Sequence, residues 1–163
     1  MSESVLKGKK ILAVDDEPDI LALLEEEIKD SCPSCLLDKA TTYEDAVKYL
    51  ESTYYDVVIL DIMGVSGFEL LDLAVKKDLK VAILTAHALS PEALKKSMNM
   101  KARAYLPKEK LGQVVPFLED ILKYDYESGW KHLMGKLYDF FNQKFETDWE
   151  KKTGGPWSEW IGK

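Results

Sequence analysis

The stretch Asp56-Val57-Val58-Ile59-Leu60-Asp61 decides the fold class of this chain. Its four consecutive apolar residues, rich in β-branched side chains, are typical of a strand that is buried on both faces of a parallel sheet. The run ends in an acid, Asp61, which is followed by a glycine-containing loop (residues 62–67) and a helical pattern from Phe68. Sites in open α/β sheets form outside the carboxyl ends of the strands, so Asp61 is placed where chemistry is done.

Similar units of a strand followed by a helix surround this stretch. Apolar runs predict further strands at residues 11–14, 36–40, 81–85 and 104–106. Helical patterns follow them, and several carry start signals: Pro18 in a first turn, a Thr41/Glu44 capping box, and Ser90 before Pro91. Five such units in succession predict an α/β fold, a doubly wound parallel sheet with helices on both sides.

The last part of the chain, residues 124–163, breaks this rhythm. Apolar residues recur there at spacings of three and four, which predicts one amphipathic helix (Trp130, Leu133, Leu137, Phe140, Phe141 and Phe145). Gly154-Gly155-Pro156 predicts a hinge, beyond which Trp157 and Trp160 share a face. We therefore expect an α/β domain over 1–123 and a helical extension over 124–163. The aromatic stripe is typical of a packing face, which would dock on the domain or, in a homodimer, on a second copy.

Composition narrows the classes of partner. A net charge of -7 argues against binding to nucleic acid. No run approaches the roughly 20 apolar residues of a membrane span, and the N-terminus has no apolar signal-peptide core, so we expect a cytoplasmic protein with no membrane contact. Cys32 and Cys35 form an isolated C-x-x-C without a second pair, and we interpret them as two ordinary thiols in a turn around Pro33.

Acids and polar groups follow the predicted strands. Asp15 and Asp16 follow the first strand, Asp61 the third, Thr85 ends the fourth, and Lys108 comes just after the fifth. Carboxylates at one edge repel each other unless a cation lies among them, and an all-oxygen cluster suits Mg²⁺. A metal-neutralised aspartate can attack a phosphoryl group, whose three oxygens would then be held by the metal, an ammonium group and a hydroxyl. The sequence thus predicts that Asp61, Thr85 and Lys108 act together on phosphate.

These segments, residues 11–19, 57–61, 82–86 and 105–108, resemble the receiver domain of bacterial two-component response regulators, over about residues 8 to 123. The resemblance implies a flavodoxin-like (βα)5 fold with strand order 2-1-3-4-5, like that of CheY. It implies that Asp61 accepts a phosphoryl group from a histidine kinase or a histidine phosphotransfer protein. The chain would then be a signalling phosphoacceptor rather than an enzyme, and a conformational change would carry the signal to an unidentified downstream protein.

The resemblance also assigns the metal ligands. Asp16, Asp61 and the main-chain oxygen of Met63 would hold Mg²⁺, and Asp15 would assist through water. The family usually has Met-Pro in this loop and a glycine eight residues after the phosphoacceptor, whereas Gly67 lies only six residues after Asp61. The loop is therefore shortened, which would alter its contacts with a kinase.

A switch is implied by the same resemblance. Thr85 would move to hydrogen-bond the phosphoryl group, Lys108 would pair with it, and Tyr105 would turn inward into the space that Thr85 vacates. In the family the lysine often precedes a cis proline, but here Pro107 comes before Lys108 and Glu109 follows it. We therefore expect a trans peptide between Lys108 and Glu109.

Two other functions stay open. A phosphatase of the haloacid dehalogenase type also uses Mg²⁺ and an aspartate after a strand, but it needs a second acid two residues later, where this chain has Met63. A scaffold that is never phosphorylated and dimerises through its aromatic helix is the other alternative. A DNA-binding output domain is not expected, because residues 124–163 carry seven acids against six lysines and are too few for a winged helix.

Overall fold

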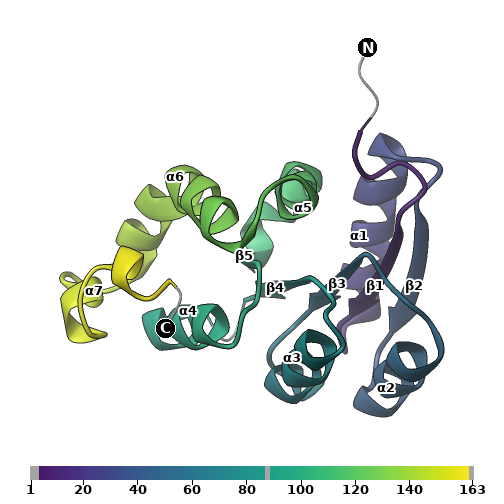
Figure 1. The fold of residues 1–163 in the computed structure, drawn as a ribbon, viewed down its shortest axis with the longest axis horizontal. Coiled ribbons are helices and arrows are strands. Elements are labelled where there is room, and N and C mark those ends of the chain that lie inside the picture. The colour runs from purple at the N-terminus through teal and green to yellow at the C-terminus, as the bar shows by residue number, and fades with distance from the viewer. Residues whose placement is uncertain (1–3, 87–88, 162–163) are drawn as a thin grey trace.

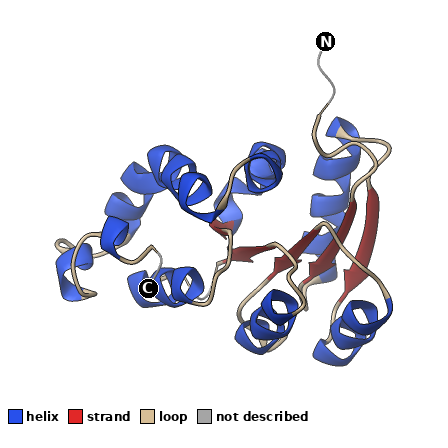
Figure 2. Cartoon of the chain, viewed as in Figure 1, coloured by secondary structure: helices blue, strands red, loops and turns tan. Residues whose placement is uncertain are grey.

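The core of the fold is a parallel sheet with helices on both faces. The computed structural model describes residues 4–86 and 89–161 (Figure 1). Five strands are arranged in the order β2-β1-β3-β4-β5, as predicted. The strands are β1 (Lys10–Val14), β2 (Leu36–Ala40), β3 (Val57–Leu60), β4 (Val81–Thr85) and β5 (Ala104–Pro107). Every residue of β3, β4 and β5 is buried, because helices cover both faces of these strands (Figure 2).

The helices form two layers. On one side of the sheet lie α1 (Pro18–Ser31) and α5 (Val114–Lys123), which follows a 3₁₀ helix, η1 (Lys108–Gln113). The other side is covered by α2 (Tyr43–Ser52), α3 (Gly67–Lys76) and α4 (Pro91–Asn99) (Figure 1). Ser90 caps α4 as predicted, accepting a hydrogen bond from the Ala93 amide. The cap of α2 is Thr42, one residue later than the predicted Thr41, because the helix begins at Tyr43 and the Thr42 hydroxyl accepts from the Asp45 amide.

The C-terminal extension contains more structure than its periodicity predicted. Helix α6 (Tyr126–Lys144) is the expected amphipathic helix, but the chain leaves it at Phe145 and forms a short helix, α7 (Trp149–Lys152), and a 3₁₀ turn, η2 (Trp157–Glu159). Asp148 adopts a left-handed conformation at the start of α7. A helix of one turn has too few residues for a periodic pattern, so α7 could not be predicted from the spacing of apolar residues.

The extension docks on its own chain. Helix α6 lies over α5 and β5, and its buried side chains belong to the same core as the sheet (Figure 1). Trp130 donates from Nε1 to the Ala102 carbonyl over 2.9 Å, and the Tyr126 hydroxyl donates to the Met98 carbonyl over 2.6 Å. Of the two docking partners that the sequence left open, the structure shows the first. Independent folding of residues 1–123 stays a prediction.

Two smaller expectations concern the cysteines and the membrane. Cys32 and Cys35 are free, buried thiols in the turn between α1 and β2. Cys35 donates to the Leu6 carbonyl, and burial raises the pKa of its thiol to about 12, which disfavours the reactive thiolate. Within residues 4–86 and 89–161, no helix has both the length and the apolar character that crossing a bilayer requires.

A substitution at Gly135 tests the helical conformation in the middle of α6. This glycine lies in the middle of the helix. Apart from its chain neighbours and the backbone of its own helix, no atom of the described residues lies within 4 Å of a Cβ added there. Gly135→Ala should therefore raise the free energy of unfolding by about 0.5–1 kcal/mol, since alanine loses less conformational entropy in a helix. Urea titration measures the shift. Gly154→Ala should lower stability instead, because Gly154 has φ +109° and its added Cβ would crowd the Lys95 ammonium group.

Candidate functional site

The strand ends bring the predicted acids together. Val14 and Leu60 are paired between β1 and β3, so the residues that follow them, Asp15 and Asp61, lie side by side. The Asp61 amide donates to the Val14 carbonyl over 3.0 Å, which fixes this register. One carboxylate oxygen from each of Asp15, Asp16 and Asp61 lies within 4.8 Å of the other two. The carboxylates of Asp15 and Asp61 are buried, whereas Asp16 is exposed.

Lys108 lies among these acids. Its Nζ is 3.0 Å from Asp15 Oδ2 and 3.2 Å from Asp61 Oδ2, and its side chain is only 9% exposed. Glu17 Oε1 lies 3.6 Å from the same nitrogen. Glu17 was not among the predicted site residues, although it directly follows the two acids at the end of β1. Lys108 therefore spans the carboxyl ends of β1 and β3 from its position after β5.

Burial and neighbouring groups shift the pKa values of Asp15 and Lys108. Burial raises the pKa of the Asp15 carboxyl above its ordinary value, although hydrogen bonds from the Glu17 amide and Lys108 act in the opposite direction. Burial alone would lower the pKa of Lys108, but its hydrogen bond to Asp15 and the charges of Asp61 and Asp15 outweigh it and raise that pKa. Lys108 thus remains an ammonium group at neutral pH and can balance the carboxylates.

The two carboxylate oxygens of Asp61 differ in their surroundings. Oδ2 faces Lys108, but Oδ1 is buried and has no hydrogen-bond partner among the residues that the structure describes. A buried, unpaired carboxylate oxygen is costly unless a cation or donor reaches it. The side-chain atoms of the cluster that could coordinate a cation are carboxylate oxygens, and the three acids lie close enough to share one ion. This donor set fits Mg²⁺, with Asp15, Asp16 and Asp61 as the side chains that would hold it. Coordination of the metal by the main-chain oxygen of Met63 stays a prediction.

The loop after Asp61 depends on two glycines. Gly64 has φ +87°, and a Cβ added there would overlap the Asp16 carboxylate. A Cβ on Gly67 would overlap the main-chain oxygen of Asp61, and the Gly67 amide closes the loop by donating to the Ile62 carbonyl over 3.0 Å. Only glycine fits these positions, because the loop passes directly against the two acids.

Gly64→Ala should weaken metal binding. The added methyl group would push the Asp16 carboxylate out of the cluster, so we expect Mg²⁺ affinity to fall about tenfold, as for other groups that position metal ligands. Calorimetric titration with Mg²⁺ measures the change. Gly8→Ala is the matched control, since Gly8 also has a left-handed φ of +72°, but apart from its chain neighbours no atom in residues 4–86 and 89–161 lies within 4 Å of the added Cβ. Equal losses of affinity in both variants would contradict a specific role for Gly64.

Thr85 and Tyr105 lie on the neighbouring strands. Thr85 is fully buried at the carboxyl end of β4 and is paired with Pro107, the residue before Lys108. Tyr105 is also fully buried, and its hydroxyl accepts a hydrogen bond from the Ser90 amide over 3.1 Å. Burial raises the pKa of the Tyr105 hydroxyl. The structure thus places Thr85 on β4, the strand next to β3, and Tyr105 on β5, one strand further from the acids. Their action as a switch stays a prediction.

The peptide after Lys108 is trans, as expected. No cis peptide bond occurs within residues 4–86 and 89–161, and the lysine reaches the acids from the first residue of η1. The change in order from lysine-proline to proline-lysine therefore leaves the ammonium group in the acidic cluster.

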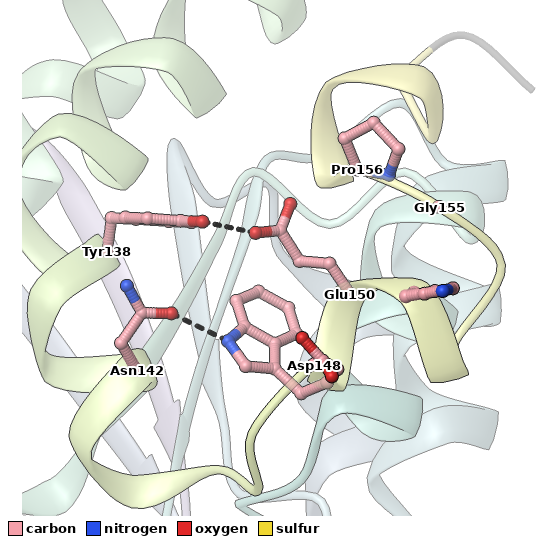
Figure 3. A pocket seen from close by; sticks show the side chains of 8 residues that line it. Tyr138, Asn142, Asp148, Glu150, Gly155 and Pro156 are labelled. Carbon is pink, nitrogen blue, oxygen red and sulfur yellow. Dashed lines mark hydrogen bonds between the residues drawn. The ribbon is translucent and has the colours of Figure 1, made fainter.

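A hollow of about 420 Å³ lies in the extension (Figure 3). Figure 3 shows the Tyr138 hydroxyl bonded to Glu150, and Trp149 Nε1 donates to Asn142 Oδ1 over 2.8 Å. The other oxygen of Glu150 accepts from the Trp157 amide. Because these groups bond to each other, they hold α7 against α6. The acidic cluster at the strand ends is the stronger candidate site.

Comparison with known proteins identifies a family for the α/β part of the chain. A family model described as "Response regulator receiver domain" matches residues 11–115. A solved structure of the response regulator TrrA from Thermotoga maritima, in complex with Mg²⁺ and BeF, is 37% identical, with 68% of this chain and 98% of that chain covered and a TM-score of 0.56. Comparison with curated proteins gave no match.

Two further structures are similar in fold. A CheY-like response regulator receiver domain from Methanospirillum hungatei JF-1 is 24% identical, with a TM-score of 0.58, and 71% of this chain and 97% of that chain are covered. The response regulator domain of CheB from Thermotoga maritima is 19% identical, with a TM-score of 0.63 and coverage of 73% and 99%. At these identities the likeness concerns the fold alone.

Proposed function

The chain belongs to the response regulator receiver domain family, and we propose that its Asp61 accepts a phosphoryl group from a histidine kinase or a histidine phosphotransfer protein. The observation that carries the proposal is the buried Asp61 carboxylate in a cluster of three acids. One of its oxygens binds Lys108, and the other has no hydrogen-bond partner in the described part of the chain. A cation placed there would leave the carboxylate ready to react with a dianionic phosphoryl group.

Each residue has a defined task in this step. A carboxylate oxygen of Asp61 forms a bond to phosphorus while the bond from phosphorus to the donor imidazole nitrogen breaks, and the nitrogen keeps the electron pair. Mg²⁺, when bound, neutralises the acids and takes part of the charge of the phosphoryl oxygens. Lys108 exchanges its contact with the Asp61 carboxylate for one with a phosphoryl oxygen, and the Thr85 hydroxyl donates to another.

The output in this proposal is a shift between two conformations. Phosphorylation changes the equilibrium only through its different interaction with the two forms. Between them, Thr85 would move to the phosphoryl group and Tyr105 would turn into the space that Thr85 vacates. A downstream protein would recognise the favoured form, so the chain acts as a phosphoacceptor in the cytoplasm and its own catalysis is limited to gaining and losing the phosphoryl group. Dimerisation of the phosphorylated chain is compatible with this scheme.

Incubation with acetyl phosphate and Mg²⁺ tests the function. Intact-mass spectrometry should show one adduct of roughly 80 Da, the mass of a phosphoryl group on an aspartate, and omission of Mg²⁺ should greatly reduce it. Steady turnover of phosphate esters would indicate a phosphatase instead. A chain that neither gains mass nor turns over phosphate esters would be a scaffold that is not phosphorylated.

A further inference from the structure

The end of α6 contacts the segment that carries Lys108. On the strand side, the Tyr105 ring lies 6.2 Å from the Phe141 ring, centroid to centroid. On the other side of Lys108, Glu109 Oε1 lies 3.1 Å from Lys144 Nζ. Both partners are in the last turns of α6, so the residues that bracket the lysine of the acidic cluster are held by the extension.

A third contact reinforces this arrangement. The Lys110 ammonium group lies 5.4 Å from the centre of the Phe140 ring, and Lys144 lies 5.6 Å from the same ring. Cations at this distance are attracted by the face of an aromatic ring. Displacement of η1 would therefore change several contacts with α6 at once.

An aromatic series continues from this point to the end of the extension. Phe141 stacks on Phe145 at 5.2 Å, Phe145 meets the edge of Trp149 at 5.2 Å, and Trp149 meets Trp160 at 6.1 Å. All four side chains are buried. Because tightly packed rings cannot shift singly without clashes or voids, a displacement at Phe141 is transmitted along the extension.

Helix α4 forms a second connection between the domain and the extension. The Tyr105 hydroxyl holds the Ser90 amide just before α4, and Lys95 Nζ donates to the Thr153 carbonyl over 2.6 Å. Lys95 also lies 5.6 Å from the centre of the Trp160 ring. Tyr105 therefore contacts the extension directly, at α6, and indirectly through α4, which binds the end of the extension.

We propose that residues 126–160 are an internal sensor of the acidic site, whose docking on the domain loosens when Asp61 is phosphorylated. This inference rests on the proposed function. In the structure, α6 contacts Tyr105 and Glu109. In this arrangement Lys108 binds the Asp15 and Asp61 carboxylates directly. A phosphoryl group on Asp61 lies between that carboxylate and Lys108, so the lysine and its neighbours move and their contacts with α6 are lost. Packed interfaces respond to such shifts by changing between discrete arrangements.

Hydrogen exchange of the full chain tests this coupling. The chain is incubated with acetyl phosphate and Mg²⁺, intact mass confirms the adduct, and amide exchange is compared with Mg²⁺ alone. We expect exchange in residues 137–160 to become about fivefold faster, the low end of typical coupling between two sites. Peptides from α2, on the opposite edge of the sheet, should not change.

Coupling is reciprocal, which supplies a second measurement. Phe141→Leu removes the ring contact with Tyr105 and should raise the steady-state phosphorylated fraction, because a loosely docked extension opposes phosphorylation less. Met134→Leu is the matched control, since Met134 is buried on the same helix and the substitution conserves volume. Circular dichroism verifies that both variants are folded, and the wild-type exchange experiment does not depend on them.

The outcomes separate the two hypotheses. Phosphorylated Asp61 with faster exchange in the extension supports both. A phosphoryl adduct with unchanged or slower exchange would overturn the sensor and leave the phosphoacceptor function intact. Failure to form any adduct would overturn the proposed function, and the sensor with it. Equal phosphorylated fractions in Phe141→Leu and Met134→Leu would also contradict the sensor.

Discussion

The Asp61→Asn variant is expected to gain no phosphoryl group. Asparagine has nearly the volume of aspartate, so the variant should fold, but its amide oxygen carries no negative charge with which to attack phosphorus. It also removes one of the three carboxylates that gather around the candidate metal position. Incubation with acetyl phosphate and Mg²⁺ should therefore give complete loss of the adduct of roughly 80 Da, as measured by intact-mass spectrometry.

Asp56→Asn is the control for this experiment. Asp56 precedes β3 as Asp61 follows it, so the same chemical change is made at the opposite end of one strand. Asp56 Oδ2 accepts a hydrogen bond from the Lys10 amide over 2.8 Å, a structural contact far from the strand ends that form the site. The control should keep the full adduct. An adduct that persists in Asp61→Asn would place the phosphoacceptor on another residue.

The arrangement of the site could be predicted because it follows from strand order alone. Once the sequence is interpreted as alternating strands and helices, the carboxyl ends of the parallel strands must lie at the same edge of the sheet. Asp15, Asp61 and Lys108 each come directly after a strand, and they do meet there. The contribution of Glu17 could not be predicted in this way, because it depends on how the side chain turns back from the start of α1 toward Lys108.

The docking of the extension could not be read from periodicity. The spacing of Trp130 and Phe141 predicts which face of α6 is buried, but not which surface covers it. That choice depends on single complementary groups, such as the Ala102 carbonyl that accepts from Trp130 and the ring of Tyr105. Short elements such as α7 are likewise set by contacts across the fold, here the hydrogen bond from Trp149 to Asn142.

The Trp130→Ala variant should be the most destabilised single substitution in the extension. Trp130 is fully buried between α6 and the domain, and truncation of a buried tryptophan leaves a cavity that costs about 3–5 kcal/mol. The Ala102 carbonyl would also lose its partner, although water entering the cavity could satisfy it. We therefore expect the free energy of unfolding to fall by about 4 kcal/mol, measured by urea titration with circular dichroism.

Trp157→Ala is the matched control, because Trp157 is only partly buried at the start of η2 and should lose much less stability. Trp130→Phe is expected to fall between them, since it keeps an aromatic ring in the core but removes the hydrogen bond to Ala102. The shape of the unfolding curve carries further information. One transition with a lowered midpoint means that α6 and the sheet unfold together, as their shared core implies. A separate early transition, with the domain's own midpoint unchanged, would contradict that single core and make the extension an independently unfolding unit.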